Sequence, residues 1–318
     1  MKKSDKLSGK RLRNSAAKYG GSFFRILMLS AVGYLVIFPL VYIISNSLKT
    51  QEAFRNPLIV WITSSISFDS YKLAFEALDY KNSIVATIIY EIVSAVLEVG
   101  SCAVAAYGLS RFEFKGKKVF MAFLLLMIIV PEQMIVLPNT VTYSNFSFFG
   151  ITTLINKLFG TEIRLNILDT VLPFWMPSIF GVGLKAGILI YIYMQFFKGL
   201  PKELEEAAWI DGAGPYRTFF SIAIPSSTVV IFTVFIFSII WHWNDYSYAI
   251  MYVNENYTTA VKLSDIVTIL QGMGYYNSDV ASSIILAACL IFILPVLVLY
   301  IAVQKKFIKS IDRVGITG

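Results

Sequence analysis

Long uncharged apolar runs constrain the fold of this chain more than any other feature. Residues 26–48 form 23 consecutive positions without a charged side chain, and residues 280–304 form 25. About 20 apolar residues are enough for a helix to cross the hydrocarbon layer of a membrane. Because an unpaired backbone group in lipid is costly, a helix is the form in which such a run crosses. The chain is also only 15% charged, against about 25% in soluble domains, so we exclude the soluble classes.

Four further apolar stretches carry few charges and are also predicted to span the membrane: residues 83–109, 119–137, 171–197 and 226 to about 247. Glu91 and Glu98 lie in the first of these stretches, Glu132 lies near the end of the second, and Lys185 lies in the third. Together with the two uncharged runs, the stretches give six spans. The sequence therefore predicts an all-α polytopic membrane protein.

The distribution of basic residues sets the expected orientation. Of the 27 Lys and Arg residues, 19 fall in four alternate segments: residues 1–25, 111–118, 198–217 and 305–318. The three intervening loops hold seven. Since cytoplasmic loops retain positive charge, both termini are expected in the cytoplasm. The net charge of +7 then reflects topology rather than nucleic-acid binding, and the first span, too long for a secretion signal, is interpreted as a retained anchor.

Few residues in the chain are of the types that bind metals or form disulfides. One histidine and two cysteines exclude a histidine-rich metal site, a four-cysteine zinc site and a disulfide framework. Cys102 and Cys289 lie in apolar runs, so we interpret them as packing residues. No nucleophile, base and orienting group can be assembled, and no G-x-x-x-x-G-K-[ST] phosphate loop occurs. We therefore predict no enzyme activity, no metal site and no bound cofactor for this chain.

The cytoplasmic loop after the fourth span has the pattern of two short helices. Pro201 suits a first helical position, glutamates follow where the helix dipole favours them, and Gly212 stands where a left-handed stop is needed. A second helix is predicted over residues 215–223, with an apolar face, and Pro225 separates it from the fifth span. The loop is thus predicted to form a helix-turn-helix at the cytoplasmic surface.

A low patch lies on the first of these helices, where Ala207 and Ala208 stand between Glu206 and Trp209. A partner protein could contact such a patch closely, with the carboxylate giving the contact its direction. The alternative is an amphipathic connector without a partner, because amphipathic surface helices are common beside membranes.

The spacing of residues in this loop resembles a known family signature. Glu206-Ala207-Ala208 is followed after three residues by Gly212, and after nine more by Ile222-Ala223-Ile224-Pro225. This pattern is similar to the EAA signature of the permease subunits of binding-protein-dependent ABC importers. Ile224 stands where the family usually has leucine, a change that conserves volume.

Other segments resemble the carbohydrate-uptake branch of that family, and within it the smaller, six-span subunit of maltose-type importers. They are Asp211-Gly212-Ala213-Gly214, Phe38-Pro39-Leu40, Ser47-Leu48-Lys49, residues 107–112 and the basic tail after the sixth span. The resemblance covers nearly the whole chain and implies a protein of the bacterial cytoplasmic membrane. It implies a basic tail (1–25), a six-span permease domain (26–304) with a coupling loop (198–225), and a second basic tail (305–318).

The resemblance also implies a division of labour. This chain would translocate a carbohydrate that an extracellular binding protein delivers. The carbohydrate is expected to be an oligosaccharide. In that family the loop docks in a groove of a cytoplasmic ATPase, so ATP and Mg²⁺ are expected on two ATPase subunits, beside a second permease subunit. Closure of the ATPases would push the coupling helices together and turn the cavity outward. The positions that match the coupling motif are Glu206, Ala207, Ala208, Asp211, Gly212, Gly214, Ile222 and Pro225.

Charged side chains within spans are costly in lipid and usually face protein or water. Glu91 and Glu98 are seven residues apart and share a helix face. We expect either of them to pair with Lys185 and hold helices together. A cavity-lining role is one alternative. A proton relay is another, and it would make the chain a stand-alone ion-coupled secondary transporter.

A helix break is predicted at the outer end of the third span, where Pro131 and Pro138 free backbone groups that only protein or water can satisfy. Side chains suited to a sugar follow there: Glu132, Gln133, Asn139 and Tyr143. They supply carboxylate, amide and aromatic groups, and we predict that they line the solute path. The alternative is a proline-kinked helix end at the membrane interface.

An aromatic run, residues 241–248, closes the fifth span on the outer side. An aromatic belt at the lipid headgroups explains this run without a ligand. The alternative is a surface for the binding protein or the solute, in which Trp243 belongs to the solute path. His242 alone predicts neither a metal site nor a catalytic triad. The outer segments 144–169 and 254–279 are expected to hold short helices.

Overall fold

The computed structural model describes residues 2–50, 53, 66–161, 163–276 and 278–315. Across these residues the regular structure is helical. Extended backbone pairs only in two isolated bridges within the described ranges, Lys49 with Ile66 and Phe146 with Leu165. The predicted all-α class is therefore confirmed for this part of the chain.

Two compact units make up the chain: Met1–Ala74 with Tyr275–Leu290, and Phe75–Gly274 with Ile291–Gly318. The first unit contains α1 (Lys2–Ser47), the beginning of α3 (Asp69–Ala77) and the beginning of α18 (Ser278–Gly315). Ser70 on α3 donates a hydrogen bond to Ser283 on α18 over 3.1 Å. Ser47 and Tyr71 share a hydroxyl hydrogen bond of 2.8 Å, so polar contacts join the three helices within this unit.

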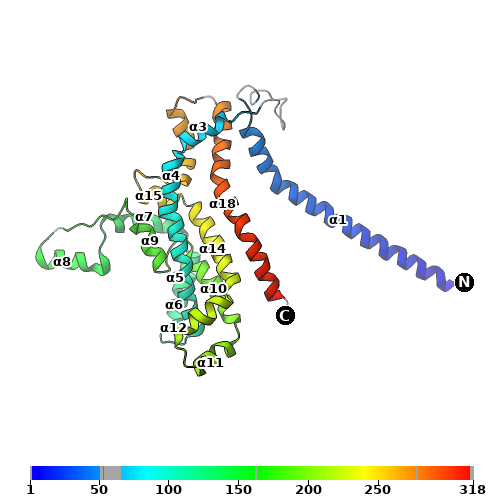
Figure 1. Cartoon of the computed structure of the whole chain (residues 1–318), viewed down its shortest axis with the longest axis horizontal. Coiled ribbons are helices and arrows are strands. Elements are labelled where there is room, and N and C mark those ends of the chain that lie inside the picture. Colours follow the sequence, from blue (N-terminus) through cyan, green and yellow to red (C-terminus); the bar gives the residue numbers. More distant parts are fainter. Residues whose placement is uncertain (1, 51–52, 54–65, 162, 277, 316–318) are drawn as a thin grey trace. The chain divides into compact units, whose positions relative to one another are not determined.

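The second unit holds most of the helices: α4 (Tyr80–Thr87), η1 (Ile88–Ile92), α5 (Val93–Arg111), α6 (Lys117–Ile129), α7 (Glu132–Ser144), η2 (Phe148–Gly150), α8 (Ile151–Phe159), α9 (Leu172–Ile179), α10 (Ala186–Gly199), α11 (Lys202–Ile210), α12 (Pro215–Thr218), η3 (Phe219–Ala223), α13 (Ile224–Ser226), α14 (Thr228–Trp243), α15 (Ser247–Tyr252), α16 (Thr259–Ser264) and α17 (Ile266–Gly272). The π-helical turn η1 joins α4 and α5 into one long helical run (Figure 1). This run packs against α9, α10 and α14 and forms the centre of the unit. The predicted short helices in segments 144–169 and 254–279 are present as α8, α16 and α17.

An aromatic core fills the space where α5, α10 and the helical turn η3 meet. Tyr193 and Phe197 on α10 are fully buried there, with their rings stacked at 5.9 Å. The ring of Tyr107 on α5 lies 5.5 Å from Phe197 and 5.0 Å from Phe219. Cys102 is buried in the same cluster, which agrees with its predicted role in packing. These aromatic pairs stabilise the packing of α5, α10 and η3 against one another.

Three helices are long and apolar enough to cross a membrane: Gly21–Ser47, Tyr80–Arg111 and Val280–Gln304. Two further pairs of helices pass the same test together, but each pair is sharply bent. The bend is 105° between Lys117–Ile129 and Glu132–Ser144, and 81° between Pro215–Ser226 and Thr228–Trp243. The described residues thus contain several membrane helices, but they do not form six straight spans.

The breaks have local causes. Val130 is extended because the following Pro131 disfavours helical geometry at the preceding residue. The predicted fourth span, residues 171–197, divides into α9 and α10, and the backbone between them has positive φ at Gly181 (68°) and Lys185 (58°). The prediction of one continuous helix for the fourth span was therefore wrong. The length of an apolar run does not show where its backbone leaves the helix.

The predicted boundary at Pro225 also lies elsewhere. The helical run continues from Pro215 through the π-helical turn η3 and Pro225 to Ser226, and it turns at Ser227. The separation between the cytoplasmic helix and the fifth span is thus displaced by two residues.

Candidate solute cavity and coupling surface

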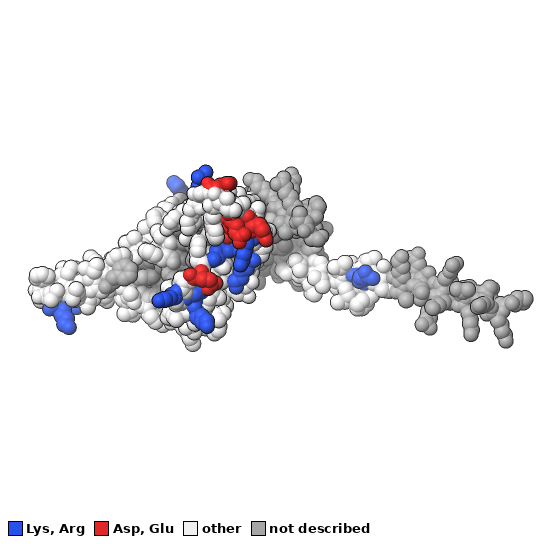
Figure 2. All heavy atoms as spheres, turned by 90° about the horizontal axis from the view of Figure 1, so that it is seen from below, with Lys and Arg blue, Asp and Glu red and all other residues white. Residues whose placement is uncertain are grey.

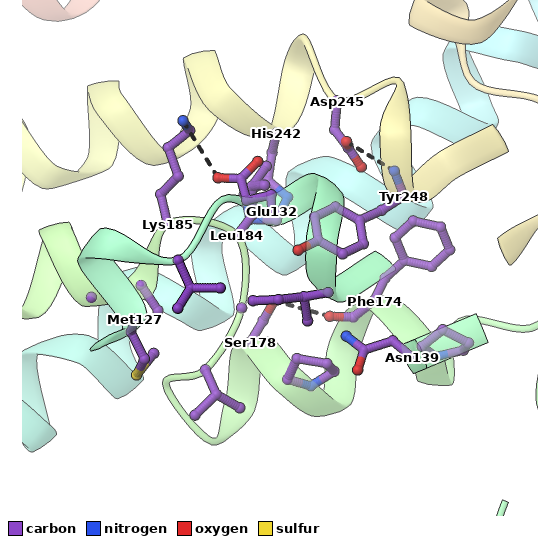
Figure 3. Close-up of a pocket in the computed structure, with 18 of the residues that line it drawn as sticks. Met127, Glu132, Asn139, Phe174, Ser178, Leu184, Lys185, His242, Asp245 and Tyr248 are labelled. Carbon is purple, nitrogen blue, oxygen red and sulfur yellow. Dashed lines mark hydrogen bonds and ion pairs between the residues drawn. The ribbon is translucent and has the colours of Figure 1, made fainter. Parts of the chain in front are cut away.

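A cavity of about 340 Å³ opens within the second unit, within the range of about 300 to 1,000 Å³ that is typical of small-molecule sites. Its walls come from the beginning of α7, from α9, from the segment between α9 and α10, and from the segment between α14 and α15 (Figure 3). The helix breaks at Val130 and before α10 therefore coincide with the cavity. This agrees with the rule that irregular backbone at membrane depth is either buried in protein or lines a water-filled cavity.

The polar residues predicted from the break at Pro131 all line this cavity: Glu132, Gln133, Asn139 and Tyr143. They come from one helix, α7, whose first residue is Glu132. Whether they contact a solute stays a prediction. The carboxylate, amide and aromatic groups of this helix can bind hydroxyl groups and the apolar face of a ligand.

Trp243, which the alternative interpretation of the aromatic run placed in the solute path, does not line this cavity. Its side chain is 5% exposed, and its indole Nε1 donates to the carbonyl oxygen of Phe292 over 3.1 Å. The two rings lie 5.6 Å apart. One step along a helix of 3.6 residues per turn rotates the side chain by about 100°. The neighbouring His242 therefore faces the cavity while Trp243 faces α18.

His242 lies between two buried glutamates. Its Nδ1 is 3.0 Å from Oε2 of Glu91, and its Nε2 is 3.1 Å from Oε2 of Glu98. Ser238, one turn earlier on α14, donates to the same Glu98 oxygen over 3.3 Å. The three residues are each 4% exposed or less. We call Glu91, Glu98 and His242 the carboxylate–imidazole cluster; it joins α14 to the long α4–α5 helix.

The expected partner of these glutamates was Lys185, and the structure corrects this. Lys185 stands in the left-handed backbone segment before α10 rather than inside a helix. Its Nζ lies 3.4 Å from Oε1 of Glu132 and 5.6 Å from the centre of the Trp241 ring. The shared face of Glu91 and Glu98 was predicted correctly, since both contact one imidazole.

Sequence reasoning missed His242 as their partner. A signal was present, because the only histidine of the chain lies in a span and two span carboxylates needed a counter-charge. The sequence does not show how α14 is rotated about its own axis. That rotation decides whether the histidine faces lipid or the two glutamates.

Gly183 permits a close approach over this cluster. A Cβ atom at this position would lie 2.6 Å from Oε1 of Glu98, 3.0 Å from Oγ of Ser178 and 3.2 Å from the Ser178 Cα atom. Only glycine fits without a shift of its neighbours. The segment between α9 and α10 therefore packs directly on the buried carboxylate.

The opposite wall of the cavity is aromatic. The ring of Phe174 lies 5.0 Å from Tyr90 and 5.6 Å from Tyr252, and Tyr143 lies 5.2 Å from Tyr252. Figure 3 shows Phe174 and Asn139 across the cavity from Lys185 and His242. The cavity thus combines charged groups on one side with aromatic and amide groups on the other.

The loop that carries the coupling motif forms α11, a turn and α12, as the sequence predicted. Gly212 has φ of 80° and ends α11 in the left-handed conformation. Glu206, Ala207 and Asp211 are exposed, and Ile210 is 86% exposed. Of the other motif positions, Gly214 and Pro225 are exposed, whereas Ala208 and Ile222 are half-buried.

The apolar face predicted for the second helix is divided. Phe219 is buried in the aromatic core, whereas Tyr216 is 83% exposed and Phe220 is exposed as well. Figure 2, seen from the end where α11 and α12 lie in Figure 1, shows acidic and basic side chains gathered there. An exposed surface with aromatic, aliphatic and charged groups is suited to a protein partner.

One glutamate of α11 has a different position from its neighbour. Glu205 is buried, and its Oε1 lies 3.0 Å from Nε of Arg111 at the end of α5. The guanidinium also donates to the carbonyl oxygen of Leu200 over 2.7 Å. This ion pair fixes α11 to the transmembrane helix α5 and leaves Glu206 directed outward.

A second ion pair near this end of α5 is exposed. Lys117 donates to Oε1 of Glu113 over 2.8 Å, and this hydrogen bond lowers the pKa of the Glu113 carboxyl below its ordinary value. The Glu113 side chain is 88% exposed, so the pair adds little to stability. Neither residue lines the cavity.

The fold and these two regions define a helical membrane protein with an internal cavity and an exposed loop for a partner, the class to which transport subunits belong. Residues 100–313 match the family model described as binding-protein-dependent transport system inner membrane component. The chain belongs to this family. It is therefore a permease component of an importer, and neither an enzyme nor a stand-alone ion-coupled transporter.

Known proteins with similar sequences cover nearly the same length. The melibiose/raffinose/stachyose import permease protein MelC of Bacillus subtilis is 28% identical over 294 residues, which are 92% of this chain and 95% of that one. The arabinooligosaccharides transport system permease protein AraQ of Halalkalibacterium halodurans is 26% identical over 292 residues, covering 90% and 93%.

A similar fold occurs in a solved bacterial ABC transporter involved in the import of the acidic polysaccharide alginate. The TM-score is 0.67 at 20% identity, and the match covers 90% of this chain and 96% of that chain. A second structure, with TM-score 0.60 and 17% identity, is that transporter in complex with an alginate pentasaccharide-bound periplasmic protein. These likenesses support the fold described above.

Proposed function

We propose that this chain is one of two permease subunits of an ATP-driven importer, and that its solute is an oligosaccharide handed over by an extracellular binding protein. The family match over residues 100–313 carries the proposal, because it includes most of the cavity wall and the exposed α11–α12 turn. Relatives over the full length are named for oligosaccharide transport. The aromatic and amide groups of the cavity support a sugar as ligand.

In the membrane, the chain crosses six times, with both tails on the cytoplasmic side. The α6–α7 pair is the third crossing, α9 and α10 together are the fourth, and the α13–α14 pair is the fifth. The concentration of 19 of 27 basic residues in alternate segments supports this orientation. Residues 1–25 and 305–318 are then cytoplasmic tails on either side of the permease domain, residues 26–304.

Coupling to ATP takes place at the α11–α12 turn. Glu206, Ala207 and Asp211 are exposed there and free to contact a cytoplasmic ATPase, while the Arg111–Glu205 pair transmits movement of α11 to α5. ATP and Mg²⁺ bind to two ATPase subunits. The permease chain contributes the docking surface and part of the solute path.

The test is purification of the chain with the products of neighbouring genes, followed by measurement of ATP hydrolysis in the presence of binding protein and a panel of oligosaccharides. The proposal predicts a complex of two different permeases and two ATPases whose hydrolysis rises with one class of oligosaccharide. A chain that moves solute without any ATPase contradicts it.

A further inference from the structure

The family does not decide the charge of the solute. One similar structure belongs to an importer of an acidic polysaccharide, whereas other relatives are named for neutral sugars such as raffinose. The charged groups of this chain's own cavity provide an independent criterion. The inference drawn from them rests on the oligosaccharide importer proposed above and specifies its substrate class.

Five ionisable acidic or basic side chains line the cavity among the described residues: Glu91, Glu132, Lys185, His242 and Asp245. Lys185 and Glu132 form an ion pair at 3.4 Å, so their charges cancel. A uronate that displaced Glu132 from Lys185 would leave Glu132 uncompensated, and the balance of charge in the cavity would not improve.

The carboxylate–imidazole cluster has a defined proton count. Both ring nitrogens of His242 face carboxylate oxygens, at 3.0 and 3.1 Å. A carboxylate accepts but does not donate, so the two hydrogen bonds require one proton more than a neutral imidazole carries. With this minimum of one added proton, on the imidazole or on a carboxyl group, the cluster has a net charge of about −1.

Two observations direct this negative charge toward a ligand. The second carboxylate oxygen of Glu91, Oε1, is buried and has no hydrogen-bond partner within the described part of the chain, and Glu91 lines the cavity. Asp245 is also buried in the cavity wall, and its Oδ1 accepts the backbone N–H of Tyr248 over 3.2 Å. The net charge of the cavity is negative if Asp245 is neutral, and it is more negative if Asp245 is ionised.

From this charge balance we infer that the imported solute is a neutral or amino-substituted oligosaccharide, and that Asp245 and Glu132 disfavour sugars that carry a carboxylate. Like charges brought together in a desolvated site disfavour the wrong partner strongly. Neutral hydroxyl groups are accommodated by the amide of Asn139, which lines the cavity, and an ammonium group is attracted by the net charge.

The experiment uses the complete importer in lipid nanodiscs, without binding protein, so that only the transmembrane path selects the sugar. Two matched probes share the same sugar chain and differ in whether the carboxyl groups are ionised or esterified: trigalacturonate and its fully methyl-esterified form, with maltotriose as a second neutral probe. Equilibrium binding is measured with and without ATP. The inference predicts that the ester binds at least about tenfold more tightly than the free acid.

Two variants test the residues. Glu132→Gln removes one negative charge from the cavity, and Asp245→Asn removes the acidic group from its wall, so both should shift the ratio of acid to ester binding toward the acid. Glu113→Gln is the matched control, because this exposed carboxylate lies outside the cavity, and it should leave the ratio unchanged. The Glu132–Lys185 pair is partly exposed, so Glu132→Gln should assemble even if Asp245→Asn does not.

The possible results separate the two levels of the proposal. Equal binding of acid and ester by the unaltered complex overturns the charge inference but leaves an oligosaccharide importer in place. An unchanged ratio in both assembled variants also overturns it. Failure of the ester and of maltotriose to bind contradicts the proposed carbohydrate function itself.

Discussion

Adjacent glutamates on α11 have different environments, and this difference yields a sharp prediction. Glu205 pairs with Arg111 over 3.0 Å, and both side chains are only 6% exposed. Glu206 is exposed at the turn. Glu205→Gln should therefore damage stability, whereas Glu206→Gln should leave stability intact and damage coupling to the ATPase.

The magnitude follows from the geometry of the pair. Two unit charges 3.0 Å apart attract by about 5.5 kcal/mol at an effective dielectric constant of about 20. Much of this attraction offsets the cost of burying the charges, but neutralising one partner leaves the other unpaired and costs about 3 to 5 kcal/mol. The double variant Arg111→Met/Glu205→Leu removes both charges and should recover part of the loss.

The assay combines thermal unfolding of the purified complex with uptake and solute-stimulated ATP hydrolysis. Glu205→Gln should lower the unfolding temperature by several degrees and reduce the yield of complex. Glu206→Gln should unfold at the original temperature but hydrolyse ATP with weaker stimulation by solute, because a charge-assisted contact is lost. A stable Glu205→Gln complex together with an unstable Glu206→Gln complex would refute the reasoning.

Three further predictions concern packing, the cavity and topology. Gly183→Ala places a methyl group 2.6 Å from the Glu98 carboxylate and should cost about 1 to 3 kcal/mol of stability. Gly100→Ala is the control and should cost none, because there is open space around the new atom. Thermal unfolding of the two variants tests this difference. Asn139→Ala should weaken solute interaction by about 0.5 to 1.5 kcal/mol, seen as a higher KM for uptake at unchanged complex yield, and a loss of assembly would contradict this. Reporter fusions after Gly116 should read cytoplasmic and fusions near Gly160 external, and a cytoplasmic signal at Gly160 would exclude the six-span topology.

Features encoded within a few consecutive residues could be predicted from the sequence. Helix α11 begins directly after Pro201 and is ended by Gly212, and both residues act on the local backbone. Two apolar runs without charges, residues 26–48 and 280–304, likewise identified helices that are long and apolar enough to span a membrane. The polar residues of α7 were found for the same reason, since Pro131 marks the helix break that exposes them.

Features that depend on how helices rotate against one another could not be predicted. Glu91 and Glu98 were assigned Lys185 as a partner because the sequence shows charge but not direction. His242 occupies that place, since α14 turns its histidine toward α5. Trp243 was assigned to the solute path only as an alternative to an aromatic belt, and the same rotation buries it against Phe292.

Photo-cross-linking at the coupling surface tests the central claim most directly. Trp209 is 48% exposed on α11, and p-benzoylphenylalanine can replace it without adding much bulk. In the complete importer this residue should cross-link to an ATPase subunit, with a yield that changes when ATP binds, while the same substitution at Phe159 on α8 should give no ATPase product. An ATPase cross-link from Phe159, or none from Trp209 in an actively transporting complex, would contradict the account.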